Sequence, residues 1–449
     1  MTGRSSSDSA GGSIERPRAA GDRPDGDDSP RVGDRTGGGA RDATDSESAD
    51  LAARLRRRIR REGAITFREW MRAALYDERG GYYRRASRRW GRAGDYRTSP
   101  ERSALFAATF ARHFATLFDE LGRPQVLQLL EAGGGAGHFA HGLLQTLRRD
   151  APRVFDSIHY VFDESSADSR ARAATLLAPT ASRVEFRRLT SFSEGGHTPG
   201  RADFSEPSER EVLTDSPERE SHSEPPEDEG FTKPLENVIV FSNELLDAFP
   251  VHRVLMRGGR LRELFVGLDA RGEFVWAEGE PSTPRLAEHF ARMGLGLAEG
   301  QTAEVNLCAE EWVARVARLV GRGYVFTVDY GDEAENLLGA PHRREGTLRA
   351  FRGHEMFEDV LRSPGAQDLT TTVNWTQVIA AGERAGLQTV ALERLDTFLL
   401  RAGLLEQLER ECALASGEAE VARLRLDARE LILPGASASH FQVLVQKKV

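Results

Sequence analysis

Short, continuously apolar runs alternate with amphipathic stretches from Pro124 onward. Apolar runs without polar alternation predict strands that are buried on both faces, and the amphipathic stretches between them predict helices. The predicted strands fall at 126–132, 158–165, 184–189, 237–243, 323–331, 387–395 and 441–448. Repeated strand–helix units of this kind predict an α/β fold with a mostly parallel sheet and helices on both faces. Ligands in such sheets bind beyond the carboxyl ends of the strands.

Other patterns flank and interrupt this alternation. Residues 51–122 read as a helical N-terminal segment, with one helix from about Thr66 to Gly80 and a long amphipathic helix opened by Ser99 and Pro100. Within the core predicted over 123–449, two insertions stand out. Alternating residues with glycine turns predict a β-meander in 251–300, and the loop-rich stretch 331–376 predicts a lid or substrate platform.

Two segments have almost no large apolar side chains. Residues 1–50 and the acidic stretch 193–234 cannot bury enough surface to offset chain entropy, so both are predicted to be disordered. They carry −4 and −8 of the net charge of −9, which leaves about +3 for the remaining chain. This balance gives no case for nucleic-acid binding.

The cysteine content and the N-terminal sequence bear on the cellular compartment in which the protein is expected. Cys308 and Cys412 are too few and too far apart in sequence for a disulfide scaffold or a zinc cluster, so no metal is expected. No apolar run reaches the ~18 residues that a membrane span requires. The N-terminus lacks a secretory h-region and contains aspartates that argue against a transit peptide. The expectation is a cytoplasmic protein, with a mitochondrial location as the alternative.

A glycine loop follows the first predicted strand of the core. Glu131 precedes Gly133, Gly135 and Gly137. A dinucleotide fingerprint requires its third glycine at the position of His138, and no lysine is near for a phosphate-binding loop. An acid beside a pyrophosphate would bring like charges together, whereas beside a cation it is favourable. The pattern favours S-adenosylmethionine, which carries a sulfonium and an amino group but no phosphate. A tight turn that only packs helix against strand is the alternative.

Acids at two later strand ends complete the predicted site. Asp163, with Glu164 in reserve, is placed to bind the ribose hydroxyls. Asn243, Glu244 and Asp247 lie in the loop 243–250, which in this architecture faces the transferred methyl group. A carboxylate pair there suits a guanidinium, which it can hold in fork geometry. The alternative is that Glu244 caps a helix and Asp247 is solvated.

Several further polar residues are weaker candidates. Asp329 ends another strand, and we expect a structural role for it. His252 follows the loop 243–250, and we expect it and His354 of the predicted lid to be surface residues. Asp368 and Asn374 also lie in the predicted lid.

The chain resembles the MidA-type S-adenosylmethionine-dependent methyltransferases, which include a mitochondrial complex I assembly factor that methylates arginine. The likeness covers roughly residues 55 to 405 outside the acidic stretch. The matching motifs are ITFREWMRAALYDERGGYY, GRAGDYRTSPE, LLEAGGGAGHF, VFDESSA, FSNELLDAFPV, VFTVDYG, GTLRAFRGH, PGAQDLTTTVNWT and FLLRAGL. The combination of GDYRTSPE, NELLDAFPV and DYG is specific, whereas the glycine loop alone is not.

The resemblance implies a class I, Rossmann-like methyltransferase fold with S-adenosylmethionine as cofactor. It also implies that the substrate is an arginine side chain of a respiratory complex I subunit or of its bacterial equivalent. It implies cofactor contacts at Glu131, Gly133, Gly135 and Asp163, and supports a functional Asn243-Glu244. It adds an active-site wall formed by Gly94, Asp95, Thr98, Ser99, Pro100 and Glu101.

The sequence departs from the family pattern in the glycine loop and in the lid. Gly134 and Ala136 replace a proline and an arginine of the loop, which makes it more flexible and weakens cofactor binding if the arginine supported it. Thr372 and Asn374 replace a histidine and an aspartate of the lid, and if either serves catalysis, the enzyme is slower or altered in substrate. The leading hypothesis is a protein arginine methyltransferase that needs no metal. The rivals are a catalytically weak assembly chaperone and a small-molecule methyltransferase, while a dinucleotide oxidoreductase is disfavoured by the glycine spacing.

Overall fold

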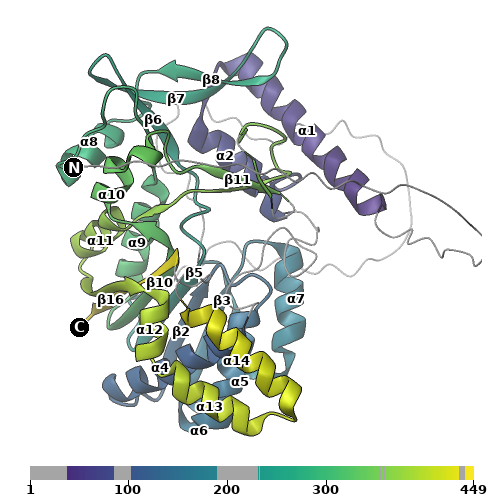
Figure 1. Cartoon of the computed structure of the whole chain (residues 1–449), viewed down its shortest axis with the longest axis vertical. Helices are drawn as coiled ribbons and strands as arrows, with labels where there is room; N and C mark the ends of the chain where they lie inside the picture. Colours follow the sequence, from purple (N-terminus) through teal and green to yellow (C-terminus); the bar gives the residue numbers. More distant parts are fainter. Residues whose placement is uncertain are drawn as a thin grey trace, which may run out of the picture.

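The main sheet of the protein is built from the predicted apolar strands. The computed structural model describes residues 38–84, 103–189, 231, 233–352, 355–357, 359–433 and 440–449. The sheet has the order β15-β16-β10-β5-β2-β3-β4, with β14 paired to β10 (Figure 1). Its strands are β2 (Leu127–Ala132), β3 (Ile158–Asp163), β4 (Val184–Phe186), β5 (Val238–Asn243), β10 (Gly323–Asp332), β14 (Val373–Asn374), β15 (Gln388–Arg394) and β16 (Phe441–Lys448). Strands β10, β5, β2, β3 and β4 are parallel, and β16 and β15 add an antiparallel edge.

Helices cover both faces of this sheet, as the continuously apolar strands predict. Alternate residues of β2 enter different cores: Leu129 packs in one apolar cluster and Leu130 in the other. The first cluster is covered by α4 (Ala104–Glu120), α5 (His138–Asp150), α12 (Leu395–Arg401) and α14 (Glu418–Ile432), and α13 (Leu404–Leu414) lies against α4. The second is covered by α9 (Leu307–Leu319) and α11 (Trp375–Arg384). The predicted α/β class is confirmed.

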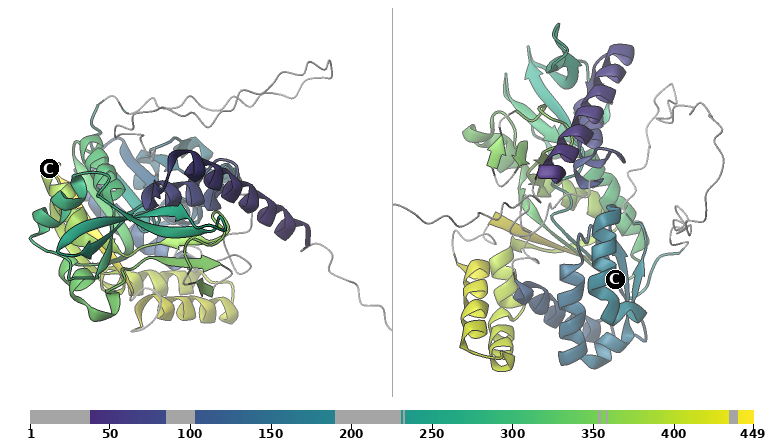
Figure 2. Two further views of the ribbon diagram at one scale, coloured as in Figure 1. Left: turned by 90° about the horizontal axis from the view of Figure 1, so that it is seen from above. Right: turned by 90° about the vertical axis from the view of Figure 1, so that its right-hand side faces the viewer.

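A second unit lies above the carboxyl ends of the main strands (Figures 1 and 2). Its sheet has the order β1-β7-β6-β9, with β8 paired to β7. These strands are β1 (Ile65–Thr66), β6 (His252–Arg257), β7 (Arg260–Leu268), β8 (Phe274–Gly279) and β9 (Thr302–Val305). The helices α1 (Gly38–Glu62) and α2 (Phe67–Tyr76) pack on β7 around buried Phe67 and Trp70. The N-terminal segment and the predicted meander therefore share one core.

Short elements complete the structure. A small sheet of β12 (Glu355–Phe357), β11 (Arg349–Arg352) and β13 (Asp368–Thr370) lies within the predicted lid. The remaining elements are η1 (Tyr82–Arg84), α6 (Pro152–Ser157), α7 (Ala167–Leu177), η2 (Ala178–Arg183), α8 (Arg285–Met293), α10 (Ala334–Gly339) and η3 (Pro341–Arg343). No helix among the described residues is long and apolar enough to cross a membrane.

Two predictions about the N-terminal region are wrong. Disorder was expected over 1–50, but α1 begins at Gly38, because its later turns bury Leu51, Leu55 and Ile59 and extend the helix backward. The long helix was expected to open at Ser99, but its N-cap is Ser103, whose hydroxyl accepts a hydrogen bond from the backbone N–H of Leu105. That helix, α4, packs on the main sheet, so it belongs to the core and not to the N-terminal segment. Residues 1–37 and most of 193–234 lie outside the described residues.

Candidate active site at the strand ends

The glycine loop has no room for side chains. Gly133, Gly135 and Gly137 have φ angles of +70°, +57° and +83°, a region that favours glycine. At Gly134 a Cβ atom would lie 2.3 Å from the ring of Phe162. At Gly133 it would lie 2.9 Å from Leu245, which belongs to the loop 243–250. The two predicted site loops therefore touch, and packing against Leu245 and Phe162 requires glycine at these two positions.

Two buried acids lie beside the glycine loop. Glu131 is buried and accepts a hydrogen bond of 2.7 Å from the hydroxyl of Tyr160, and burial raises its pKa to about 8. Both carboxylate oxygens of Glu164 accept backbone N–H groups, from Gly135 at 2.9 Å and from Ser166 at 2.6 Å. Glu164 thus holds the loop in place, and its reserve role in ribose binding stays a prediction.

Asp163 lies where the sequence places it, at the carboxyl end of β3. Its Cα partner on β2 is Ala132, directly beside Glu131, and its side chain is fully buried. Its carbonyl oxygen accepts the N–H of Gly134 at 2.9 Å. The two predicted cofactor acids, Glu131 and Asp163, therefore lie at the carboxyl ends of adjacent strands, one register position apart.

The loop 243–250 has a strained start and a carboxylate beneath it. Glu244 has φ of +51°, which is uncommon for a residue with a side chain, and its Oε1 accepts a 3.0 Å hydrogen bond from the Asn243 amide. One oxygen of Asp329 accepts the backbone N–H groups of Leu245, Leu246 and Asp247 at 3.2, 2.9 and 3.3 Å. These bonds give Asp329 the structural role expected of it.

Asp247 is the least satisfied acid of this loop. Its side chain is only 5 % exposed, and Oδ1 has no hydrogen-bond partner among the described residues. Burial, followed by the charges of Asp329, Glu244 and Asp368, raises its pKa well above the usual range. Because Asp329 has several backbone donors and Asp247 has few, we assign the negative charge to Asp329 and the proton to Asp247. Such a group is ready to become a carboxylate when a cation approaches.

Comparison with known proteins identifies the family. Residues 109–392 match the model of a family described as S-adenosyl-L-methionine-dependent methyltransferases. The chain belongs to this methyltransferase family. The fold agrees with the crystal structure of a Burkholderia thailandensis protein bound to S-adenosyl-homocysteine, with a TM-score of 0.73, 26 % identity, and coverage of 90 % of this chain and 93 % of that one.

Curated relatives carry the name protein arginine methyltransferase NDUFAF7, mitochondrial. The human protein is 26 % identical over 359 residues, 77 % of this chain and 72 % of its own length. The homolog from Drosophila melanogaster is 27 % identical over 349 residues, 76 % of this chain and 72 % of its own length. The predicted family, and S-adenosylmethionine as its cofactor, are thereby confirmed.

The residues at the strand ends of this methyltransferase fit that cofactor. The bare loop 133–137 offers backbone to a ligand without phosphate, and Glu131 and Asp163 stand on adjacent strands beside it. Carboxylates there can accept hydrogen bonds from an amino group and from ribose hydroxyls. Gly137 is the N-cap of α5, with no side-chain cap of its own.

Other predicted residues lie elsewhere. Gly94, Asp95, Thr98, Ser99, Pro100, Glu101 and His354 fall outside the described residues. His252 was expected at the surface but is buried in the second sheet, 2.7 Å from Glu263, because β6 and β7 pair at that point. Asn374 is the N-cap of α11, accepting the N–H of Gln377, and an aspartate could serve equally. Thr372 donates its backbone N–H to the Thr347 hydroxyl.

Sequence reasoning missed two tyrosines that join the units. The Tyr76 hydroxyl donates to the carbonyl of Ala248 at 3.0 Å, and the Tyr83 hydroxyl donates to Oδ1 of Asp368 at 2.8 Å. Both tyrosines belong to the quoted motif ITFREWMRAALYDERGGYY, but nothing in its local pattern indicates partners some 170 and 285 residues away. Their ring centroids are 5.4 Å apart.

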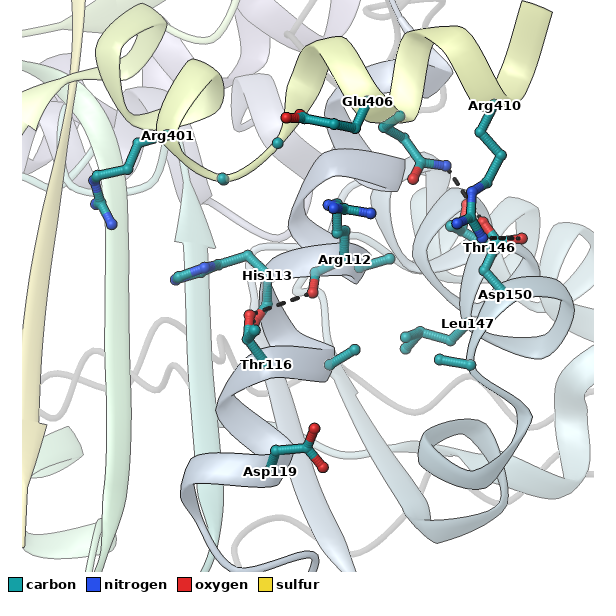
Figure 3. Close-up of a pocket in the computed structure, with 16 residues that line it drawn as sticks. Arg112, His113, Thr116, Asp119, Thr146, Leu147, Asp150, Arg401, Glu406 and Arg410 are labelled. Carbon is teal, nitrogen blue, oxygen red and sulfur yellow. Dashed lines mark hydrogen bonds and ion pairs between the residues drawn. The ribbon is translucent and has the colours of Figure 1, made fainter. Parts of the chain in front are cut away.

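A cavity of about 480 Å³ lies at a different place in the molecule (Figure 3). It is lined by residues of α4, the last turns of α5, and the α12–α13 corner, among them Arg112, His113, Leu147, Asp150 and Arg401. The glycine loop precedes the first turn of α5, and a helix of that length spans about 20 Å. The cavity is therefore separate from the candidate active site.

Proposed function

We propose that this methyltransferase transfers a methyl group to a guanidinium nitrogen of a protein arginine. The observation that carries the proposal is Asp247, a nearly buried carboxyl whose Oδ1 has no hydrogen-bond partner among the described residues and whose neighbours Glu244, Asp329 and Asp368 are acids. Such a group is stabilised by a cationic ligand. A guanidinium is cationic, planar and rich in donors, so it matches this site. The names of the relatives agree with this assignment.

The residues of the chain divide the work between two loops. S-adenosylmethionine supplies a methyl group bound to a sulfonium. Glu131, Asp163 and the glycine loop hold the cofactor beside the loop 243–250, which Gly133 approaches at Leu245. Glu244 and Asp247 orient the guanidinium so that one nitrogen faces the methyl group. Alignment supplies most of the rate acceleration.

The proton balance of the transfer also falls to these residues. A nitrogen–carbon bond forms as the sulfur–carbon bond breaks, and the attacking nitrogen loses one proton. A carboxylate oxygen of Glu244 or Asp247 can accept it. The methylated guanidinium keeps its positive charge, so it remains paired with the acids. Asn374 caps α11, a role that an aspartate could serve equally.

A methylation assay tests the proposal. The protein is incubated with methyl-labelled cofactor and peptides that contain a single arginine or a single lysine, and products are mapped by mass spectrometry. We expect label on arginine, and Asp247→Asn should lower kcat/KM by about 100-fold, as for loss of a charge-stabilising group. Asp396→Asn, a buried aspartate on α12, is the matched control and should stay near wild type. Label on lysine or on neither residue would contradict the proposal.

The identity and location of the substrate protein are further parts of the proposal. A respiratory complex I subunit, or its bacterial equivalent, is the expected substrate protein. The relatives are named mitochondrial, whereas the cytoplasmic location expected from the sequence stays a prediction. Cell fractionation and mass spectrometry of the arginine-methylated proteins after deletion would test both.

A further inference from the structure

Three separate chain segments meet beside the loop 243–250. Tyr76 ends α2 and donates its hydroxyl to the carbonyl of Ala248. Tyr83 lies in η1, contacts the Tyr76 ring in a tilted arrangement with centroids 5.4 Å apart and an interplanar angle of 34°, and donates its hydroxyl to Asp368 at 2.8 Å. Asp368 begins β13 of the predicted lid. The tyrosine pair thus links the lid to the loop that holds Asp247.

A second link runs directly between the lid and this loop. Thr371, three residues after Asp368, donates its backbone N–H to the carbonyl of Asp247 at 2.9 Å. Asp368 itself is only 4 % exposed, and its charge is among those that raise the pKa of Asp247. Asp368 and Asp247 are therefore neighbours, fixed to each other through backbone and tyrosine hydrogen bonds.

The residues at this junction combine acidic and aromatic side chains. Glu244, Asp247 and Asp368 bring three carboxyl groups together, and Asp247 has an oxygen without a partner among the described residues. Tyr76 and Tyr83 add two half-buried aromatic rings. A guanidinium forms parallel hydrogen bonds with carboxylates and stacks on aromatic faces, whereas an ammonium group is a compact, strongly hydrated charge. The combination suits the flat cation better.

We propose that Asp368 is a third carboxylate of the acceptor subsite and that the Tyr76–Tyr83 pair forms its aromatic wall, so that these residues select arginine over lysine. This inference rests on the proposed function. Asp368 contacts the guanidinium. Tyr83 is a positioning residue, because its hydroxyl fixes the rotamer of Asp368. The lid and the N-terminal segment thereby supply the specificity that the core loops lack.

Steady-state kinetics of Asp368→Asn and Tyr83→Phe test the inference. Tyr83→Phe removes one hydroxyl and keeps the ring, so the fold is preserved. With the arginine peptide, we expect KM to rise about tenfold for each variant while kcat changes less, since one charged contact or its orientation is lost. Affinity for S-adenosyl-homocysteine, measured by calorimetry, should stay within about twofold of wild type.

A control separates this effect from the general loss of a tyrosine–carboxylate hydrogen bond. Tyr324, near the start of β10, donates an exposed hydrogen bond of the same length, 2.8 Å, to Glu120, and Tyr324→Phe should leave KM unchanged. If wild type methylates arginine and both Asp368→Asn and Tyr83→Phe keep its KM, the inference fails alone. An equal loss of cofactor affinity in these variants would also overturn it, because it would show a structural role. If wild type methylates no arginine, the proposed function fails and the inference falls with it.

Discussion

The glycine loop and the loop 243–250 follow neighbouring parallel strands, yet they are built in opposite ways. The first, after β2, is stripped of side chains, and the second, after β5, is rich in acids. Each is pinned by a carboxylate from an adjacent strand or its end: Glu164 holds Gly135, and Asp329 holds three amides of the loop 243–250. In both cases a carboxylate that accepts backbone N–H groups fixes the loop, although the two loops carry different side chains.

The difference between the loops matches the ligands proposed for them. In the first loop, Cβ atoms at Gly133 and Gly134 would meet Leu245 and Phe162 of the protein itself, so internal packing requires glycine there, and the backbone carries no side chains at these positions. A cationic acceptor requires charge, and the positive φ of Glu244 shows that the chain tolerates backbone strain to place it. The glycine loop is thus distinguished by its missing side chains, and the loop 243–250 by its acidic side chains.

The largest effect is expected where one side chain holds most of a loop. Asp329→Ala removes the acceptor of three backbone N–H groups in the loop 243–250 and leaves them buried. We expect a loss of about 3 kcal/mol in the free energy of unfolding, together with loss of methyl transfer. Chemical denaturation followed by circular dichroism measures the first quantity.

Glu164→Gln is the matched comparison for this change. It keeps an amide oxygen near Gly135, so we expect a loss of only about 1 kcal/mol and a weaker affinity for S-adenosyl-homocysteine. Should Glu164→Gln destabilise the protein as much as Asp329→Ala, the two loops would not differ in how they are held.

The strands and the family were predictable from the sequence, whereas the contacts between segments were not. The runs that became β2, β3, β5 and β10 are continuously apolar, so local pattern suffices to place them. Tyr160 could not be recognised as the partner of Glu131, because the register of β3 on β2 brings them together. Glu164 was named only as a reserve for ribose binding, and its bond to Gly135 could not be predicted because it crosses between loops.

The N-terminal region shows the second limit of sequence patterns. The start of α1 has few apolar residues, so composition predicted disorder there, but a helix that is anchored by Leu51 and Leu55 extends through it. Tyr83 and Asp368 lie 285 residues apart, and only the assembled fold makes them a pair. The local sequence pattern therefore located the loops of the site but not the tyrosine–aspartate contact beside them.

The next effect concerns the bare backbone of the glycine loop. Gly134→Ala would place a methyl group 2.3 Å from the ring of Phe162. We expect it to cost about 1–3 kcal/mol of stability and to weaken S-adenosyl-homocysteine binding at least tenfold, because the loop must shift. Gly339→Ala, with open space around the added Cβ, is the control and should bind normally. Combining Gly134→Ala with Phe162→Leu should restore part of the affinity, and a double variant no better than the single one would argue against this contact.

The last effect is a pH dependence at Glu131, the acid beside the glycine loop. Its folded pKa of about 8 lies above its ordinary value of 4.5. Between these values the unfolded state is ionised while the folded state keeps its proton, so stability falls as the pH rises from about 5 to 8. Glu131→Gln removes this component, and the difference in thermal midpoint between wild type and variant should shrink or reverse across that range. Tyr160→Phe removes the hydrogen bond that opposes the shift and should extend the dependence to higher pH. A difference that stays constant across this pH range would mean that Glu131 is already ionised in the folded protein, which would contradict its raised pKa.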